Sequence, residues 1–208
     1  MNLILADYDG TLTAGDSHGA LLRHILLTRC WPLLLVLLLC PLLLLLGLLS
    51  RPKAVWLLWW CTTLGADGRA WRRWVADYAR REAPLFTEAR ELLAREGGRV
   101  WVVSASPRAL VRRRLCHQLG GLRVGRVLGS RMGFSLGAIV PRHYSFGVAK
   151  RDLLPGMKSG CAELALSDAL SDLPLLALGR EAWLINPSPG RLARGCKRLP
   201  RLAARHWR

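Results

Sequence analysis

The chain has 208 residues, of which 51% are hydrophobic, and its 31 Lys and Arg against 14 Asp and Glu give a formal net charge of +17. This length allows one sizeable domain, or one domain with an insert, but not two full domains. The hydrophobic content excludes a disordered chain, and basic residues set beside a long leucine block argue against a nucleic-acid partner. A basic, apolar, Trp-rich protein is instead suited to an anionic membrane surface.

The six cysteines are scattered, without a Cys-x-x-Cys pair or a histidine at metal-ligand spacing. We interpret them as structural thiols in a reducing compartment. No removable signal peptide is predicted, because an apolar strand begins almost directly after Met1.

The first predicted strand begins at Leu3 and ends at two acids, Asp7 and Asp9, which are followed by Gly10. Residues alternate faces along an extended strand, so the two carboxylates can point the same way, and glycine permits a sharp turn behind them. Two carboxylates at one strand end can hold a hard cation. Alone, this pattern is a weak signal, because acidic turns with glycine are common at protein surfaces.

A helix is predicted directly behind this motif, capped by Asp16 or Ser17. Residues 30–50 then carry no charge over 21 positions, and as one helix they would span about 31 Å at ~1.5 Å per residue. Pro41 predicts a kink or break near the middle. If Asp7 shares a site with motifs after residue 100, one membrane crossing is excluded, and we expect a re-entrant or interfacial helical hairpin bent near Pro41.

Three further interpretations concern the segment that follows. Residues 54–64 are too short for a return span and have the tryptophan content of an interfacial element. Residues 67–81 form an amphipathic basic helix, suited either to core packing or to anionic lipid. The leucine block itself could also be a buried helix inside a soluble cap.

Three motifs follow after residue 100. Residues 99–104 are a second apolar strand, and Ser106 as cap with Pro107 at the first helical position predicts a helix behind it. Hydroxyls at a strand end beside a helix amino terminus form an anion site, although they could merely cap the helix. Lys150 is predicted to begin a helix and to be the lysine of the site, and Lys158 is a competing candidate for that lysine. Residues 162–166 form a strand that leads to Asp168, with Asp172 one turn further along.

The alternation of strands and helices predicts an α/β fold with a doubly wound parallel sheet, which binds ligands at the carboxyl ends of its strands. Asp7, Ser104 and Asp168 fall at such ends. In this order the four motifs resemble those of haloacid dehalogenase phosphatases, in the subclass with a cap between motifs one and two. The resemblance implies a Rossmann-like catalytic core at 1–15 and 85–190, an all-helical, membrane-associated cap at 16–84 and a basic C-terminal tail at 191–208.

The resemblance also implies residue roles and Mg²⁺ as cofactor. Asp7 is the nucleophile and Asp9 the general acid and base. Ser104, Ala105 and Lys150 bind phosphate, Asp7, Asp9 and Asp168 bind the metal, Asp172 supports them, and Arg23 is a possible substrate contact.

The run from Asp16 through the leucine block to residue 62 is also similar to the phosphatidylglycerophosphatase C family, as is the run from Ser167 to Leu176. This implies dephosphorylation of phosphatidylglycerophosphate to phosphatidylglycerol at the cell inner membrane, with the site facing the cytoplasm and an anionic phospholipid as partner. The alternatives are a phosphatase for a soluble phosphomonoester such as phosphoserine, whose cap is only an anchor, and a non-catalytic lipid-binding module.

Overall fold

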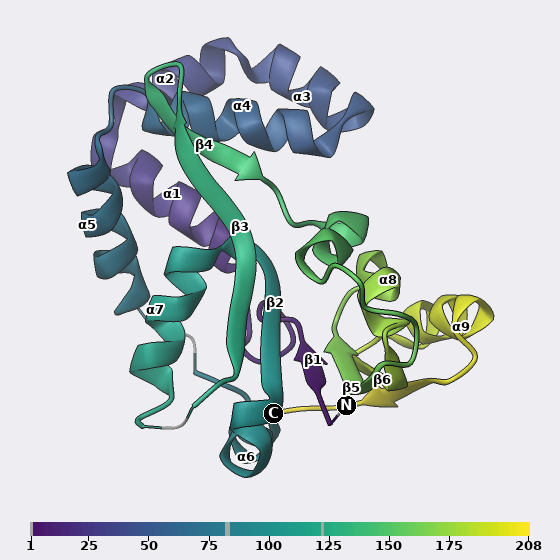
Figure 1. Cartoon of the computed structure of the whole chain (residues 1–208). Helices are drawn as coiled ribbons and strands as arrows, with labels where there is room; N and C mark the ends of the chain where they lie inside the picture. Colours follow the sequence, from purple (N-terminus) through teal and green to yellow (C-terminus); the bar gives the residue numbers. More distant parts are fainter. Residues whose placement is uncertain (1, 82–83, 122) are drawn as a thin grey trace.

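The strands form a single sheet in the computed structural model, which describes residues 2–81, 84–121 and 123–208 (Figure 1). They are β1 (Ile4–Ala6), β2 (Val100–Pro107), β3 (Arg126–Ser135), β4 (Ala138–His143), β5 (Ala162–Ser167), β6 (Gly179–Ile185) and β7 (Leu202–Arg205). Their order is β4-β3-β2-β1-β5-β6-β7, and every neighbouring pair is parallel except β3 and β4. The predicted α/β fold with a largely parallel sheet is therefore confirmed.

Helices cover both faces of this sheet, which explains why the central strand β1 is apolar on both sides. One face packs against α6 (Thr87–Glu96) and α7 (Arg108–Gln118). The other packs against η2 (Gly147–Leu153), α8 (Leu173–Leu176) and α9 (Pro189–Arg198). The short turns η1 (Gly97–Arg99) and η3 (Leu170–Asp172) lie beside them in sequence.

The basic C-terminal segment belongs to this core. It forms most of α9 and all of β7, which pairs in parallel with β6 at the edge of the sheet. Trp207, only 8% exposed, lies in the same apolar cluster as β1 and α6. The sequence did not predict this strand, because four residues reading Leu-Ala-Ala-Arg carry little β-branched or alternating signal.

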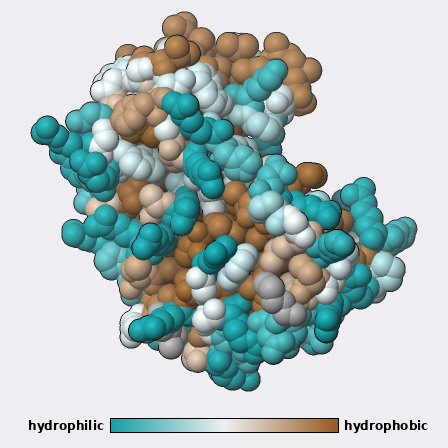
Figure 2. Space-filling model, in the orientation of Figure 1, coloured by the Kyte–Doolittle hydropathy of each residue, from teal (hydrophilic) through white to brown (hydrophobic). Residues whose placement is uncertain are grey.

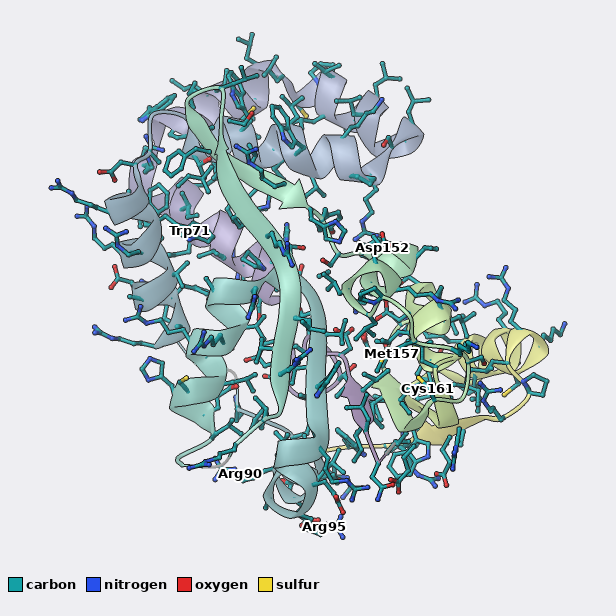
Figure 3. The ribbon with its side chains drawn as sticks, viewed as in Figure 1. Trp71, Arg90, Arg95, Asp152, Met157 and Cys161 are labelled. Atoms are coloured by element: carbon teal, nitrogen blue, oxygen red, sulfur yellow. The ribbon has the colours of Figure 1, made fainter. Side chains whose placement is uncertain are left out.

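The cap is the group of helices at one end of the sheet, which we define as residues 17–79 (Figure 1). It consists of α1 (Ser17–Arg29), α2 (Trp31–Leu38), α3 (Cys40–Leu49), α4 (Arg51–Thr63) and α5 (Gly68–Ala79). Its own cluster includes Trp59, fully buried, and Trp71, which points inward from α5 (Figure 3), with 5.9 Å between the two ring centroids. Ile139 and Val140 of β4 complete the cluster, while the elements within residues 17–79 themselves are all helices.

The leucine block is divided differently from the prediction. Pro32, Pro41 and Pro52 each lie in the first turn of a separate helix, α2, α3 and α4. Proline has no N–H to donate and is tolerated only in that first turn, so each proline begins a helix instead of kinking one. The break predicted near Pro41 is present, at Leu39, but the chain reverses at the extended Ser50 rather than near Pro41 (Figure 1).

The outer surface of the cap is apolar (Figure 2). We call this surface the leucine face; it comprises Leu27, Trp31, Leu33, Leu34, Leu37, Leu38, Leu42, Leu44, Leu45, Leu48 and Leu49. α3 buries no residue and α2 buries only Pro32, so the leucine block is not the buried helix of the alternative interpretation. Within the described residues no single helix is long and apolar enough to cross a membrane; α1 and α2 reach that length together but meet at a bend of 118°.

Candidate active site

The turn after β1 directs Asp7 and Asp9 to the carboxyl end of the sheet. Between them, Tyr8 points into the core, where its hydroxyl donates to Gln118 Oε1 at 2.9 Å. Gly10 closes the turn with φ of +72°, and an added Cβ would lie 2.5 Å from Asp168 Oδ2. Both the backbone conformation and the contact with Asp168 therefore require glycine here.

Lys150 is the cation at the centre of the site. Its Nζ lies 2.8 Å from Asp7 Oδ2 and 2.6 Å from Asp172 Oδ2, and all three residues are buried. The Ser167 hydroxyl also donates to Asp172, at 2.8 Å. The competing candidate Lys158 is exposed, so burial separates the two lysines. Asp172 does not cap α8 with its side chain. Its Oδ2 accepts both contacts, and its buried Oδ1 has no hydrogen-bond partner among the described residues.

Burial and neighbouring charges shift the pKa values of Asp7 and Lys150. Burial raises the pKa of Asp7, the Lys150 charge acts to lower it and the Asp172 charge adds to the rise, so that it stands well above the usual value. Burial alone would lower the pKa of Lys150, but the charges of Asp7 and Asp172 outweigh burial and raise it. Lys150 is therefore held in its charged form.

Asp9 is held by hydroxyl and amide donors. The Ser106 hydroxyl donates to its Oδ2 at 2.6 Å, the Ser17 backbone N–H to its Oδ1 at 2.8 Å, and the Ser104 hydroxyl lies 3.4 Å from Oδ2. The prediction that Ser106 caps the following helix was wrong. Strand β2 continues to Pro107 and α7 begins at Arg108, because the Ser106 side chain is bonded to Asp9 instead of to the helix amides.

Asp168 follows β5 and faces the same turn. Its backbone N–H donates to Thr11 Oγ1 at 2.9 Å, which fixes the β5 end against the β1 loop. Burial raises the pKa of Asp168, and the nearby charge of Asp172 raises it further. Asp7 and Asp168 are thus two carboxylates whose negative charge is only partly compensated.

These residues line a cavity of about 350 Å³ between the core and the cap, which we call the catalytic cavity. Of the predicted residues, Asp7, Asp9, Ala105, Lys150, Asp168 and Asp172 line it. Ser104 is fully buried beside Asp9, and Ser106, not predicted, lines the cavity instead. Arg23 lines a separate cleft.

The cap and the chain after β4 supply residues that the sequence did not predict as site residues. His18, Arg51, Tyr144 and Phe146 all line the catalytic cavity. The Arg51 guanidinium lies 3.9 Å from the Phe146 ring centroid, and this contact holds a cation at the wall of the cavity. Only the tertiary fold brings the start of α4 beside residues 144–146, so no local pattern could have found them.

The donor set fits a magnesium ion. In the described ranges no three His, Cys, Asp or Glu side chains are grouped closely enough to hold a metal, and the Asp9 carboxylate is bonded to Ser106 and Ser17. Two carboxylates, Asp7 and Asp168, still line the cavity. Mg²⁺ is typically bound by one or two carboxylates together with water and substrate phosphate oxygens. The raised pKa values of both carboxyls indicate negative charge that a cation would compensate.

Residues 4–177 match the model of the haloacid dehalogenase-like hydrolase family. The chain belongs to this family. The predicted family resemblance and the assignment to an enzyme are thereby confirmed.

Solved structures share the fold of this haloacid dehalogenase-like hydrolase. A protein of unknown function from Bordetella pertussis superposes with a TM-score of 0.68 at 18% identity, covering 97% of this chain and 96% of that one. A phosphoserine phosphohydrolase-like protein from Francisella tularensis gives 0.57 at 13% identity, covering 98% and 95%. A substrate-bound phosphoserine phosphatase gives 0.59 at 16%, covering 91% and 88%. The search of curated protein sequences gives no match.

Proposed function

We propose that this protein is a magnesium-dependent phosphatase that removes the terminal phosphate of an anionic phospholipid, with phosphatidylglycerophosphate as substrate. The observation that carries the proposal is that the catalytic cavity adjoins an exposed apolar surface. The α4 residues Arg51, Val55 and Leu58 line the cavity, and the α3 helix packed on α4 carries part of the leucine face. A lipid phosphate could therefore reach Asp7 while its acyl chains remain in the membrane.

In the first step the Asp7 carboxylate attacks phosphorus, forming an aspartyl-phosphate as the bond to the leaving oxygen breaks. Lys150, 2.8 Å from Asp7 Oδ2, offsets the charge of the incoming phosphate. Asp172 keeps Lys150 in place through its 2.6 Å contact. Asp9 gives a proton to the departing alkoxide, so the product leaves as a neutral hydroxyl.

In the second step Asp9 takes a proton from water, which attacks phosphorus and breaks the bond to Asp7. Inorganic phosphate leaves and the carboxylate is restored. The bonds from Ser106 and from the Ser17 backbone N–H fix Asp9 for both proton transfers. Mg²⁺ held by Asp7, Asp168 and the Asp9 main-chain carbonyl would neutralise the phosphate dianion against the attacking carboxylate.

An apolar cleft that shares Tyr144 with the catalytic cavity supports a lipid substrate. It has a volume of about 570 Å³ and lies between α3, α4 and the end of β4, with Leu42, Leu46, Trp56 and Leu57 among its lining residues. Tyr144 lines both this cleft and the catalytic cavity. Lys53 and Arg142 lie at the same cleft and complement an anionic headgroup. We propose that it receives the first part of an acyl chain.

The same features support a membrane location. The leucine face and the net charge of +17 suit the surface of an anionic bilayer. We propose that the protein lies on the inner membrane with the catalytic cavity open to the cytoplasm.

A soluble phosphomonoester such as phosphoserine is the second candidate substrate. The catalytic cavity of about 350 Å³ is small enough for such a molecule, and Arg51 could neutralise its carboxylate. Two of the solved structures with this fold are phosphoserine phosphatase or a related protein.

The experiment compares phosphate release from phosphatidylglycerophosphate in mixed micelles with release from phosphoserine, with and without Mg²⁺. We expect the micellar lipid to be hydrolysed with the higher kcat/KM, only with Mg²⁺, and not at all by Asp7→Asn. Asp152→Asn, an exposed carboxylate outside the cavity, is the matched control and should keep full activity.

Three other outcomes separate the alternatives. A higher kcat/KM for phosphoserine would overturn the assignment of a lipid substrate but leave the assignment of phosphatase activity intact. If Asp7→Asn released phosphate as fast as the unmodified protein, the assignment of Asp7 as the nucleophile would be wrong. No release from either substrate, with lipid binding retained, would favour a non-catalytic lipid-binding module.

A further inference from the structure

A second charged cleft adjoins the catalytic cavity. It has a volume of about 660 Å³ and is lined by Ala14, Gly15, Asp16, Gly19, Ala20, Arg23, Tyr78, Arg81 and Arg114. Gly15, Asp16 and Gly19 line both spaces, so the turn leading into α1 separates them. We call this space the arginine cleft, because three guanidinium groups line it.

Among the residues that the structure describes, Arg114 is a buried cation without a carboxylate counter-ion. It is 3% exposed, and its Nη1 donates to Ser17 Oγ at 2.5 Å. Its Nε is buried without a hydrogen-bond partner, and no carboxylate of residues 2–81, 84–121 and 123–208 forms an ion pair with it. Its remaining neighbours include two aromatic rings, of Tyr8 and Tyr78, each 5.7 Å from the guanidinium carbon. Burying an uncompensated charge costs several kcal/mol, so an anion from outside the chain would fit here.

The other charges of the cleft favour the same kind of ligand. Arg23 and Arg81 form no ion pair with any described carboxylate. The acid that lines the cleft, Asp16, already accepts the His18 and Gly19 backbone N–H groups at 3.0 and 3.1 Å. Three guanidinium groups therefore face a single engaged carboxylate, and guanidinium forks match the geometry of phosphate oxygens.

We propose that the arginine cleft binds a phosphate-class oxyanion, either free inorganic phosphate or the phosphate of a lipid headgroup. The bound anion completes the hydrogen bonding of Arg114, which in turn holds Ser17, whose backbone N–H bonds Asp9. The site is thus connected to the general acid and base without opening into its cavity. Its existence does not depend on the reaction proposed above.

The test counts bound phosphate by equilibrium dialysis with radiolabelled inorganic phosphate, using the full chain. Arg23→Gln combined with Arg81→Gln should bind one equivalent less than the unmodified protein, or bind that equivalent at least tenfold more weakly. The matched control is Arg69→Gln combined with Arg73→Gln, which removes the same charge from two exposed arginines outside the cleft. Circular dichroism checks that both double variants are folded.

The catalytic cavity is unchanged in all three proteins, so phosphate bound there cancels in these comparisons. Equal numbers and affinities of sites in all three proteins would overturn the proposal. Repeating the titration with glycerophosphoglycerol, the soluble headgroup diester of phosphatidylglycerol, identifies the source. Tighter binding of the diester would indicate a lipid headgroup, and tighter binding of inorganic phosphate would indicate the free anion.

Discussion

At the scale of single residues, the buried charges of the catalytic cavity determine which substitutions it tolerates. Lys150 compensates two carboxylates, Asp7 and Asp172, and all three side chains are buried in the wall of the catalytic cavity. Because burial penalises the charged forms of Asp7 and Lys150, removing a partner from this cluster leaves the remaining charges in an unfavourable state. Stability and catalysis are therefore linked through this cluster.

Replacing Lys150 with Met tests that link. Breaking a buried ion pair by removing one partner costs about 3–5 kcal/mol, so we expect the free energy of unfolding in urea to fall by about this amount in metal-free buffer. Phosphate release should fall at least a hundredfold. Lys158→Met is the matched control, since Lys158 is exposed, and should change neither quantity. Equal unfolding free energies for the two variants would contradict the buried cluster.

His24 gives the protein a pH-dependent stability. Burial lowers the pKa of His24, and the charge of Arg81 lowers it further. As the pH falls, His24 in the unfolded chain therefore takes up a proton near pH 6.5, whereas His24 in the folded protein takes one up only at a lower pH. The stabilisation is complete above pH 6.5 and is lost as the pH falls through the lower folded pKa.

Urea unfolding at pH 7.5 and pH 5.0 measures this contribution. His24→Gln should lose less unfolding free energy between the two pH values than the unmodified protein loses. His117→Gln, which changes an exposed histidine, should lose the same amount as the unmodified protein. If His24→Gln retains the full loss, another group is responsible.

Among the elements, the three proline-initiated helices α2, α3 and α4 determine which apolar side chains the cap exposes. Since α3 buries no residue and packs on α4, it presents most of its leucines outward. Fully burying one leucine side chain is worth about 1.5–3 kcal/mol, so a surface of this size favours an apolar partner strongly.

Replacing Leu34, Leu38 and Leu44 together with Ser tests this surface. These residues are 72%, 76% and 67% exposed, so the fold should survive, while binding to vesicles containing phosphatidylglycerol should weaken at least tenfold. Cosedimentation measures the binding. Val148→Ser, at an exposed apolar position outside the cap, is the control and should bind like the unmodified protein. Unchanged cosedimentation of the triple variant would rule out the leucine face as the membrane contact.

For the whole molecule, the last residues of the chain complete a core that its first residues begin. Trp207 packs in the cluster that contains Ile4 and Ala6, and Asn186 bonds its backbone on both sides, at 2.8 and 3.2 Å. The C-terminal segment is therefore a structural part of the catalytic core.

Trp207→Ala should consequently destabilise the entire protein. Truncating a buried tryptophan costs about 3–5 kcal/mol. For a chain of this size that corresponds to a fall in Tm of roughly 6–20 °C. Differential scanning calorimetry measures it, with His206→Ala as the control at the exposed neighbouring position. A Tm within a degree or two of the control would mean that the C-terminal residues contribute nothing to the core.

The amino-acid sequence by itself determined the order of the motifs and the parallel sheet. Asp7 and Asp168 each follow a short apolar run, and the carboxyl ends of parallel strands must meet at one edge. Their convergence could therefore be predicted without coordinates. Residues 87–96 lie between Pro84 and two glycines, a pattern that by itself predicts a short helix, and α6 has these bounds.

Only the tertiary structure decided between residues that look alike locally. Lys150 and Lys158 differ in burial, and Ser104 and Ser106 differ in which of them lines the cavity, neither of which periodicity reveals. Arg51 joins the site through a contact with Phe146, a residue 95 positions away. Strand propensity and spacing describe neighbours along the chain, whereas burial and such contacts depend on how distant segments pack.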